Sequence, residues 1–191
     1  MAALQTGNPS RICETKGLAR RLMDHAAIAG EYKRIKADPA FRLRVTHHDT
    51  KISNVLFDQA GKGICIIDLD TLMPGYFISD LGDMMRTYLS PVNEEGKDTE
   101  NILIRDDFYQ AIVHGYYEEM KDELSRQEKQ HMYYSSLFMT YMQTLRFLTD
   151  YLHNDKYYLP AYPGHNLVRA QNQSVLLERL MERKAFLELV K

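Results

Sequence analysis

The residues best suited to chemistry lie in one short segment, residues 47–54 (HHDTKISN). After a turn comes an apolar run, residues 64–67 (ICII), which leads into residues 68–70 (DLD). The segment holds an Asp, a Lys two residues later and an Asn five residues later, and a further Asp follows the apolar strand. This is the spacing of a phosphoryl-transfer catalytic loop and its metal-binding aspartate. The pattern therefore indicates phosphoryl transfer.

Each polar residue of this pattern has a role that fits such chemistry. A carboxylate must accept or orient the proton of the attacking hydroxyl, and Asp49 is the candidate. A cation offsets the charge that develops on the transferred group, and Lys51 can supply it. Mg2+ prefers oxygen ligands, which Asn54 and Asp68 offer. Asp70 is a candidate for a further metal contact.

A β-hairpin would bring these residues together. Residues 55–57 and 64–67 are short, apolar and β-branched, and the turn at 58–63 contains two glycines. Asn54 enters the first strand and Asp68 leaves the second, so antiparallel pairing places both at one end of the hairpin. Asp and Asn alone are common in turns. Their joint spacing, together with the hairpin, favours the functional interpretation.

Two other kinds of site fit less well. A zinc site could use His47 and His48, but adjacent residues of an extended segment point to opposite faces, and no other His or Cys has ligand spacing. We therefore expect His47 to pack and brace the loop. A glycosidase could use Asp68 and Asp70, but the second, separated acid that it needs has no recognisable setting.

Composition narrows the function further. The 191 residues suit one domain, and 26 acidic residues against 24 Lys and Arg, without a basic tract, argue against a nucleic-acid partner. No apolar run approaches the roughly 20 residues that span a bilayer, so we expect no membrane partner. Cys13 and Cys65 form no CxxC pair, and Cys65 lies in an apolar strand where a buried free thiol is expected. These features favour a reducing, cytoplasmic location.

The predicted fold is mainly α with a small β-hairpin, an α+β class. We expect a disordered tail over residues 1–10 and one domain over residues 11–191. Asp80 can cap the helix that begins after it. Helices are predicted at 11–36, 81–89, 102–123, 126–153 and 165–190, and a short strand at 43–46.

The catalytic segment also resembles a known family. Residues 46–58 resemble the catalytic loop of the aminoglycoside phosphotransferase and choline kinase superfamily, which is protein-kinase-like. Other segments resemble, more narrowly, the N-acetylhexosamine 1-kinases of that superfamily. These segments are residues 67–75, 80–86, 145–152, 157–158 and 165–170. The similarity runs from about residue 40 to 175.

The resemblance implies the C-terminal lobe of a kinase-like phosphotransferase that uses ATP and Mg2+. The substrate it implies is a small amino sugar, phosphorylated at the anomeric hydroxyl of N-acetylglucosamine or N-acetylgalactosamine. By position, Asp49 would be the catalytic base, and Asn54 and Asp68 would bind magnesium and the nucleotide it carries.

The same resemblance implies an acceptor site and a brace. Arg146, with Tyr157 or Tyr158, would contact the sugar, since a guanidinium suits hydroxyl and acetamido oxygens and a tyrosine ring packs on a sugar face. The alternative for Arg146 is a surface position on an amphipathic helix. Asp80 would brace the catalytic loop by accepting backbone N–H bonds, although as a helix cap it needs no such role.

One expected part of such an enzyme has no counterpart in this sequence. The 46 residues before His47 contain no glycine-rich loop and no strand that carries a phosphate-binding Lys. We therefore expect the N-terminal, ATP-covering lobe to be absent. We also expect self-association through the apolar face on which such a lobe would dock.

Two alternatives to a sugar kinase stay open. The first is a kinase of the same superfamily that acts on choline, homoserine, an aminoglycoside or another small hydroxyl compound; the acids of residues 94–107 could line a pocket for an amine. The second is a truncated lobe that acts only as a binding module for a sugar or a protein.

Overall fold

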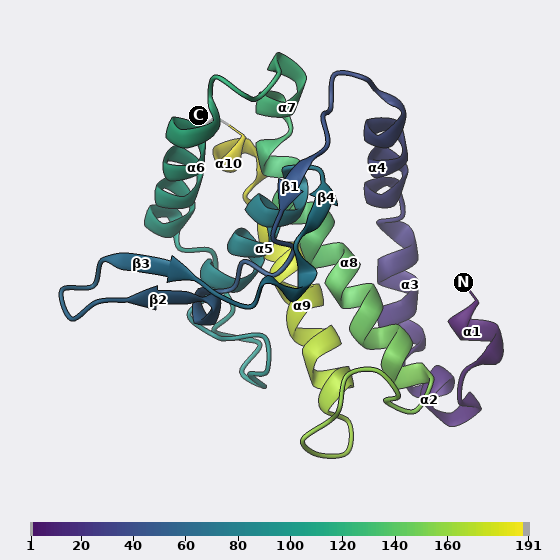
Figure 1. Cartoon of the computed structure of the whole chain (residues 1–191). Helices are drawn as coiled ribbons and strands as arrows, with labels where there is room; N and C mark the ends of the chain where they lie inside the picture. The colour runs from purple at the N-terminus through teal and green to yellow at the C-terminus, as the bar shows by residue number, and fades with distance from the viewer. Residues whose placement is uncertain (1, 189–191) are drawn as a thin grey trace.

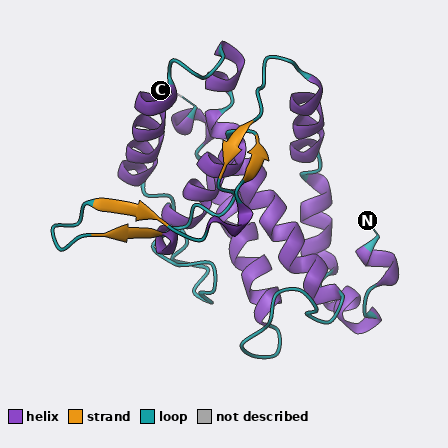
Figure 2. Ribbon diagram, viewed as in Figure 1, coloured by secondary structure: helices purple, strands orange, loops and turns teal. Residues whose placement is uncertain are grey.

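The structure, a computed structural model, describes residues 2–188 and consists mainly of helices with two small antiparallel sheets (Figures 1 and 2). This confirms the mainly α, α+β class predicted from the sequence. The helices are α1 (Ala3–Thr6), α2 (Pro9–Glu14), α3 (Lys16–Asp24), α4 (Ala27–Ala37), α5 (Ile78–Tyr88), α6 (Asp106–Met120), α7 (Arg126–Gln130), α8 (Met132–Leu152), α9 (His165–Glu182) and α10 (Lys184–Leu187). The strands are β1 (Arg44–Thr46), β2 (Val55–Phe57), β3 (Gly63–Ile66) and β4 (Met73–Gly75), with 3-10 turns η1 (Ile52–Asn54) and η2 (Leu69–Thr71).

The core forms around α8, which packs along its length against α5 and α9 (Figure 1). Apolar residues three and four positions apart give each of these helices a buried stripe. The buried residues of these three stripes include Leu81, Met85, Phe147, Leu148, Leu152, Leu176, Leu177 and Leu180. None of the helices within residues 2–188 is long and apolar enough to cross a membrane.

A glycine allows α5 and α8 to approach closely. A Cβ built on Gly82 would lie 2.2 Å from the backbone oxygen of Ser135 and 2.6 Å from Cγ of Met139. Ser135 is itself buried. The contact fixes the position of α5, and α5 carries the carboxylate of Asp80 towards the loop after β1.

The strands form two separate ribbons. β1 pairs with β4, with Thr46 opposite Met73, and this pairing was not predicted because the sequence from 73 to 75 lacks a strand pattern. β2 pairs with β3, with Val55 opposite Ile66, which gives the predicted hairpin. In Figure 1 this hairpin extends away from the helices. Its position explains a wrong prediction: Cys65, expected to be buried, is exposed because water reaches both faces of β3.

The N-terminal segment also differs from the prediction. Residue 1 lies outside the described part of the chain, but within residues 2–10 the structure has helix α1 and the start of α2 instead of a disordered tail. The side chain of Asn8 accepts hydrogen bonds from the backbone of Ser10 and Arg11, and Pro9 occupies the first helical position. The backbone N–H of Asn8 donates to the carbonyl of Leu152 at 2.8 Å, so the segment docks on α8.

Several predicted helices are interrupted or shifted. The helix expected over 11–36 is divided into three by breaks at Thr15 and at 25–26, and the one over 126–153 is divided at His131. The last helix ends at Glu182, where α10 follows; residues 189–190 of the prediction lie outside the described residues. Helix α5 begins at Ile78, so Asp80 lies in its first turn and is not its cap. Residue pattern alone does not reveal one-residue breaks.

Much apolar surface is exposed on and beside the hairpin. Ile52, Leu56, Phe57, Ile64, Ile66, Leu69 and Leu72 all have exposed side chains. Exposed apolar side chains concentrated in this way favour association with another surface. The self-association that we expect from it stays a prediction.

The close contact at Gly82 can be tested against a second helical glycine. Gly82→Ala should lower the free energy of unfolding by about 1–3 kcal/mol, because the added methyl meets the backbone of α8, which cannot move aside. Gly30→Ala is the matched control, since its Cβ would meet none of the described atoms within 4 Å, and it should stabilise by about 0.5–1 kcal/mol. Urea unfolding of both variants measures the difference; equal effects would show that α5 and α8 are not in close contact.

Candidate active site

The loop that follows β1 is held by one carboxylate. Asp80 accepts two backbone hydrogen bonds, from His47 N to Oδ2 at 2.9 Å and from His48 N to Oδ1 at 2.8 Å. His48 has a φ of 67°, in the left-handed region that residues with a side chain rarely adopt. The two bonds from Asp80 therefore offset an unfavourable backbone conformation.

The side chains of the two histidines make separate contacts. Nε2 of His47 lies 2.9 Å from the carbonyl oxygen of Ile67, just beyond β3, so it links the loop to the end of the hairpin. Nε2 of His48 lies 2.7 Å from the hydroxyl of Thr46, and its Nδ1 lies 3.0 Å from the hydroxyl of Ser79. Both rings therefore support the conformation of the loop.

Three hydroxyls that sequence reasoning missed complete the support. Thr71 donates to the carbonyl of His47 at 2.6 Å, and Thr50 donates to the carbonyl of Asp80 at 2.8 Å. The hydroxyl of Tyr88 donates to the carbonyl of Thr50. Burial raises the pKa of Tyr88 to about 12, so this hydroxyl stays a donor at neutral pH. Such residues have no spacing signal, because each bond joins positions distant in sequence.

Asp49, Lys51 and Asn54 meet at the centre of the loop. Nζ of Lys51 lies 2.9 Å from Oδ2 of Asp49, and Nδ2 of Asn54 donates to the same oxygen at 3.0 Å. Nδ2 of Asn54 also donates to the backbone carbonyl of Asp49 at 2.8 Å. The hydrogen bond to Asp49 raises the pKa of Lys51, which therefore remains a cation. Asn54 is buried and Asp49 is half-buried, so the carboxylate has a fixed position and still reaches solvent.

The hairpin places Asp68 beside this group. The backbone N–H of Ile67 donates to the carbonyl of Asn54 at 2.9 Å, and Asp68 is the next residue, with a left-handed φ of 62°. The negative charge of Asp68 acts on Lys51 and contributes, after Asp49, to its raised pKa. Asp70 lies in η2 and is exposed. The structure therefore brings Asp49, Lys51, Asn54 and Asp68 together.

These donors suit a hard, partly hydrated cation. Within residues 2–188, no hydrogen bond engages the side-chain oxygens of Asp68 or Oδ1 of Asn54, since the amide of Asn54 is turned so that its NH2 faces Asp49. The same part of the chain has no cluster of three His, Cys, Asp or Glu side chains arranged around a metal. Mg2+ is commonly bound by one or two protein oxygens together with waters and substrate phosphates. An amide oxygen and a carboxylate fit that mode.

A buried ion pair lies on α5 one turn beyond Asp80. Oδ1 of Asp83 accepts from Nε of Arg86 at 2.9 Å, and Nη1 of Arg86 also contacts Glu94 in the connection to α6. Burial raises the pKa of Asp83, against the lowering effect of Arg86, and the charge of Asp49 raises it further. Oδ2 of Asp83 is buried and has no partner among the described residues. The pair fixes the α5–α6 connection beside the loop that follows β1.

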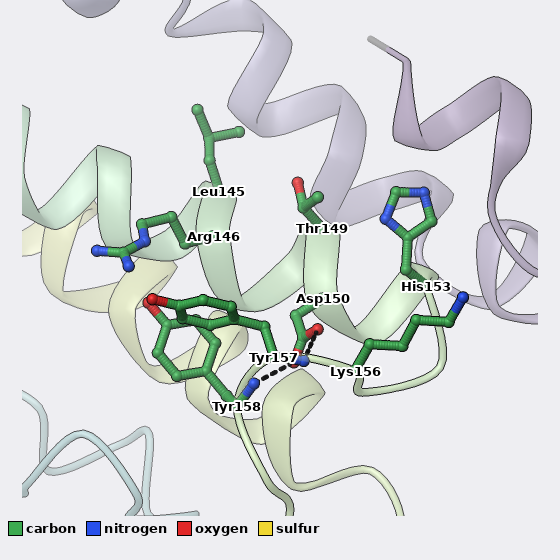
Figure 3. A pocket seen from close by; sticks show the side chains of 8 residues that line it. All are labelled: Leu145, Arg146, Thr149, Asp150, His153, Lys156, Tyr157 and Tyr158. Atoms are coloured by element: carbon green, nitrogen blue, oxygen red, sulfur yellow. Dashed lines mark hydrogen bonds between the residues drawn. The ribbon is translucent and has the colours of Figure 1, made fainter.

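The predicted acceptor residues line a cavity of their own. Arg146 of α8 and the tyrosines Tyr157 and Tyr158 of the following loop border an open cavity of about 670 Å³ (Figure 3). The two tyrosine rings are 4.7 Å apart at 77°, and the guanidinium of Arg146 lies 5.8 and 5.4 Å from their centroids. The structure thus brings these three residues together, and Arg146 faces the cavity.

Two buried residues that sequence reasoning did not assign to the site hold this loop. Oδ1 of Asp150 accepts from Tyr157 N at 2.8 Å, and Oδ2 accepts from Tyr158 N at 2.9 Å (Figure 3). Nδ2 of Asn166, from α9, donates to Oδ2 of Asp150 at 3.1 Å and to the carbonyl of Tyr158 at 2.8 Å. Both lie in segments that resemble the N-acetylhexosamine kinases, and that was the only signal for them.

Charged side chains of α5 act on both the cavity and the loop that follows β1. Burial raises the pKa of Tyr158, and the positive charges of Arg146 and Arg86 oppose this rise. Arg86 is bound to Asp83, whose carboxylate in turn lies within electrostatic range of Asp49. Arg86 and Asp83 of α5 thus lie within electrostatic range of both groups of predicted residues.

The role of Asp80 in holding the loop predicts a measurable cost. Asp80→Ala should lower the free energy of unfolding by about 1–3 kcal/mol, because two backbone N–H groups of a half-buried loop lose their acceptor. Urea unfolding measures this cost, and hydrogen exchange should become faster at the amides of residues 47 and 48.

Asp58→Ala is the matched control for this variant. Oδ1 of Asp58 also accepts two backbone hydrogen bonds, from Ala60 and Lys62 at 2.9 Å each, but in an exposed turn where water can replace it. We expect a cost below about 0.5 kcal/mol. A cost for Asp80→Ala no larger than that of the control would contradict the bracing role.

Comparison with known proteins identifies the family. A model of the phosphotransferase enzyme family (APH) matches residues 10–122, which is more than half of the chain and includes the predicted catalytic loop, the hairpin and α5. The match begins within α2, upstream of the similarity found from the sequence, so helices α3 and α4 are also part of the family pattern. The chain therefore belongs to the phosphotransferase enzyme family of the aminoglycoside phosphotransferase and protein-kinase-like superfamily.

Proposed function

We propose that this chain carries the catalytic and acceptor-binding side of an ATP- and Mg2+-dependent phosphotransferase for a small hydroxyl compound. The observation that carries the proposal is the arrangement at Asp49, whose Oδ2 lies 2.9 Å from Lys51 Nζ and 3.0 Å from Asn54 Nδ2. Phosphoryl transfer depends mainly on positioning and charge. A fixed, solvent-accessible carboxylate between a cation and metal-binding oxygens supplies both.

Each side chain has one task in the proposed reaction. Asp49 orients the acceptor hydroxyl and accepts its proton as the oxygen attacks. Asn54 and Lys51 keep Oδ2 of Asp49 in position, and the ammonium of Lys51 offsets negative charge on the transferred group. Asp80 and His47 hold the loop that presents these groups.

The nucleotide and metal would be bound at the open end of the hairpin. Oδ1 of Asn54 and the carboxylate of Asp68 are the oxygens that would hold Mg2+, with Asp70 as a further candidate. When bound, Mg2+ and ATP supply charge neutralisation on the phosphates and the phosphoryl group itself.

Among small hydroxyl acceptors, we favour an N-acetylhexosamine phosphorylated at its anomeric hydroxyl. The cavity at Arg146, Tyr157 and Tyr158 supports this choice, because it combines a guanidinium for polar oxygens with ring surface for a sugar face. The resemblance of residues 145–152 and 165–170 to N-acetylhexosamine 1-kinases supports it as well. Choline, homoserine and aminoglycosides are the acceptors against which it is tested.

Phosphorus NMR of the full chain with Mg-ATP and each acceptor in turn tests the proposal. We expect a new phosphate signal coupled to an anomeric proton with N-acetylglucosamine or N-acetylgalactosamine. Asp49→Asn should lower turnover by roughly 10²–10⁴-fold, the usual contribution of a positioned base. Asp122→Asn, at an exposed aspartate in the turn after α6, is the control and should leave turnover unchanged.

Each other outcome has a definite meaning. Near-wild-type turnover of Asp49→Asn would contradict its role as the base. Transfer to choline or homoserine alone would replace the sugar by an amine acceptor. Absence of transfer to every acceptor would contradict an enzymatic function of this chain and leave a binding module.

A further inference from the structure

The charged side chains around the acceptor cavity are unequally divided. Arg146 and Lys156 are cationic, and Asp150 is the one carboxylate among the residues that line it. In Figure 3, Arg146 lies at one end of the cavity, beside the tyrosines, and Lys156 lies towards the other. The net charge that the cavity presents to a ligand therefore depends on whether the carboxylate of Asp150 is available to that ligand.

The carboxylate of Asp150 is already engaged by the protein. Asp150 is only 6% exposed. Its two carboxylate oxygens accept hydrogen bonds from the backbone N–H groups of Tyr157 and Tyr158, and Oδ2 accepts a third from the side chain of Asn166. A carboxylate that accepts three hydrogen bonds in a buried site has little capacity left for a ligand. The cavity thus presents positive charge without an available negative partner.

The rings of Tyr157 and Tyr158 are already in contact with a cationic side chain of the protein. The guanidinium of Arg146 lies 5.8 Å from the ring centroid of Tyr157 and 5.4 Å from that of Tyr158. Gln143 supports this position, because its Oε1 lies 3.5 Å from Nη1 of Arg146 and its Nε2 donates to the hydroxyl of Tyr158 at 3.3 Å. Ligands with a quaternary or primary ammonium are recognised by ring faces and carboxylates. Here a protein cation already lies over the rings.

From this arrangement we infer that the cavity selects uncharged or anionic acceptors over cationic ones, with Arg146 as the specificity-determining residue and Asp150 as the positioning residue that presents the tyrosines. This inference rests on the proposed function, in which the cavity binds the compound that receives the phosphoryl group. It narrows the class of substrate: amine compounds such as choline are excluded, and neutral or acidic sugars and polyols remain.

The wall formed by the tyrosines is assembled before a ligand arrives. Nδ2 of Asn166 donates to Oδ1 of Asp155 at 2.9 Å, and the other oxygen of Asp155 accepts from Nη1 of Arg11 at 2.6 Å. Arg11 also donates to the carbonyl of Tyr151 at 2.7 Å. The side chain of Asp155 thus ties the loop to Asn166 of α9 and Arg11 of α2. The ring of Tyr157, 72% exposed, depends on these ties for its position.

A matched pair of sugars tests the selectivity without ATP. N-acetylglucosamine is neutral, whereas glucosamine at about pH 6.5 carries an ammonium at the same carbon. Calorimetric titration of the full chain should give at least roughly fivefold tighter binding of the neutral sugar, the size expected for one like-charge contact in water. Arg146→Glu should abolish or reverse this preference. Arg20→Glu, which makes the same charge change on the exposed surface of α3, should keep it.

Three results would overturn the inference. They are equal or tighter binding of glucosamine by the wild type, equal effects of Arg146→Glu and Arg20→Glu on the preference, and no binding of either sugar at millimolar concentration. None of them depends on phosphoryl transfer. Failure of the proposed function instead appears in the Asp49→Asn comparison, so the two failures are distinguishable.

The positioning role of Asp150 has its own measurement. Asp150→Ala should increase hydrogen exchange at the amides of residues 157 and 158 at least roughly tenfold, because both lose their acceptor. It should weaken binding of N-acetylglucosamine while exchange at the amides of residues 47 and 48 stays unchanged. Faster exchange at all four amides would indicate general destabilisation and would overturn the positioning role.

Discussion

The two hydrogen bonds from the catalytic loop to Asp80 are the interaction on which the proposed chemistry depends. Without them, the left-handed backbone at His48 would relax, and Asp49 would lose its relation to the hairpin. The carboxylate can hold the loop because α5 is itself fixed, through Gly82, against α8. Positioning of the reacting groups thus begins with close packing of two helices and reaches the loop through one side chain.

Helix α8 serves as the common reference for both halves of the proposed site. On one side it supports α5 and hence the proposed catalytic loop; towards its C-terminal end it carries Arg146 and Asp150 of the proposed acceptor wall. The two halves use the same device, a carboxylate that accepts two successive backbone N–H groups: His47 and His48 in one case, Tyr157 and Tyr158 in the other. Each carboxylate fixes main chain and leaves the neighbouring side chains available for substrate. In the second case the supporting acid is also more enclosed than the groups it serves, since Asp150 is buried whereas Tyr157 is exposed.

Local spacing predicted the grouping of those candidate side chains that are close in sequence. Asp49, Lys51 and Asn54 lie within six residues, and the hairpin that adds Asp68 is a short turn between two apolar runs. The contacts that span the fold had no such signal: Thr71, Ser79 and Tyr88 support the loop through hydroxyls that any helix or turn could contain. Local hydropathy gave a wrong prediction in two places. Cys65 lies in an apolar strand but is exposed, because the hairpin extends into solvent. The polar N-terminal segment was expected to be disordered but forms helices that dock on α8.

The contact between Arg11 and Asp155 also concerns the order in which the molecule can form. Its partners are 144 residues apart, whereas His47 and Asp80 are separated by only 33. Closing a longer stretch of chain costs more entropy and delays folding. During synthesis, the 47–54 loop and Asp80 emerge first, but the surface of α8 at Ser135 and Met139 that fixes α5 emerges only shortly before Asp155. A nascent chain would therefore gain both supports at the same late stage, when α8 and the loop after it are complete.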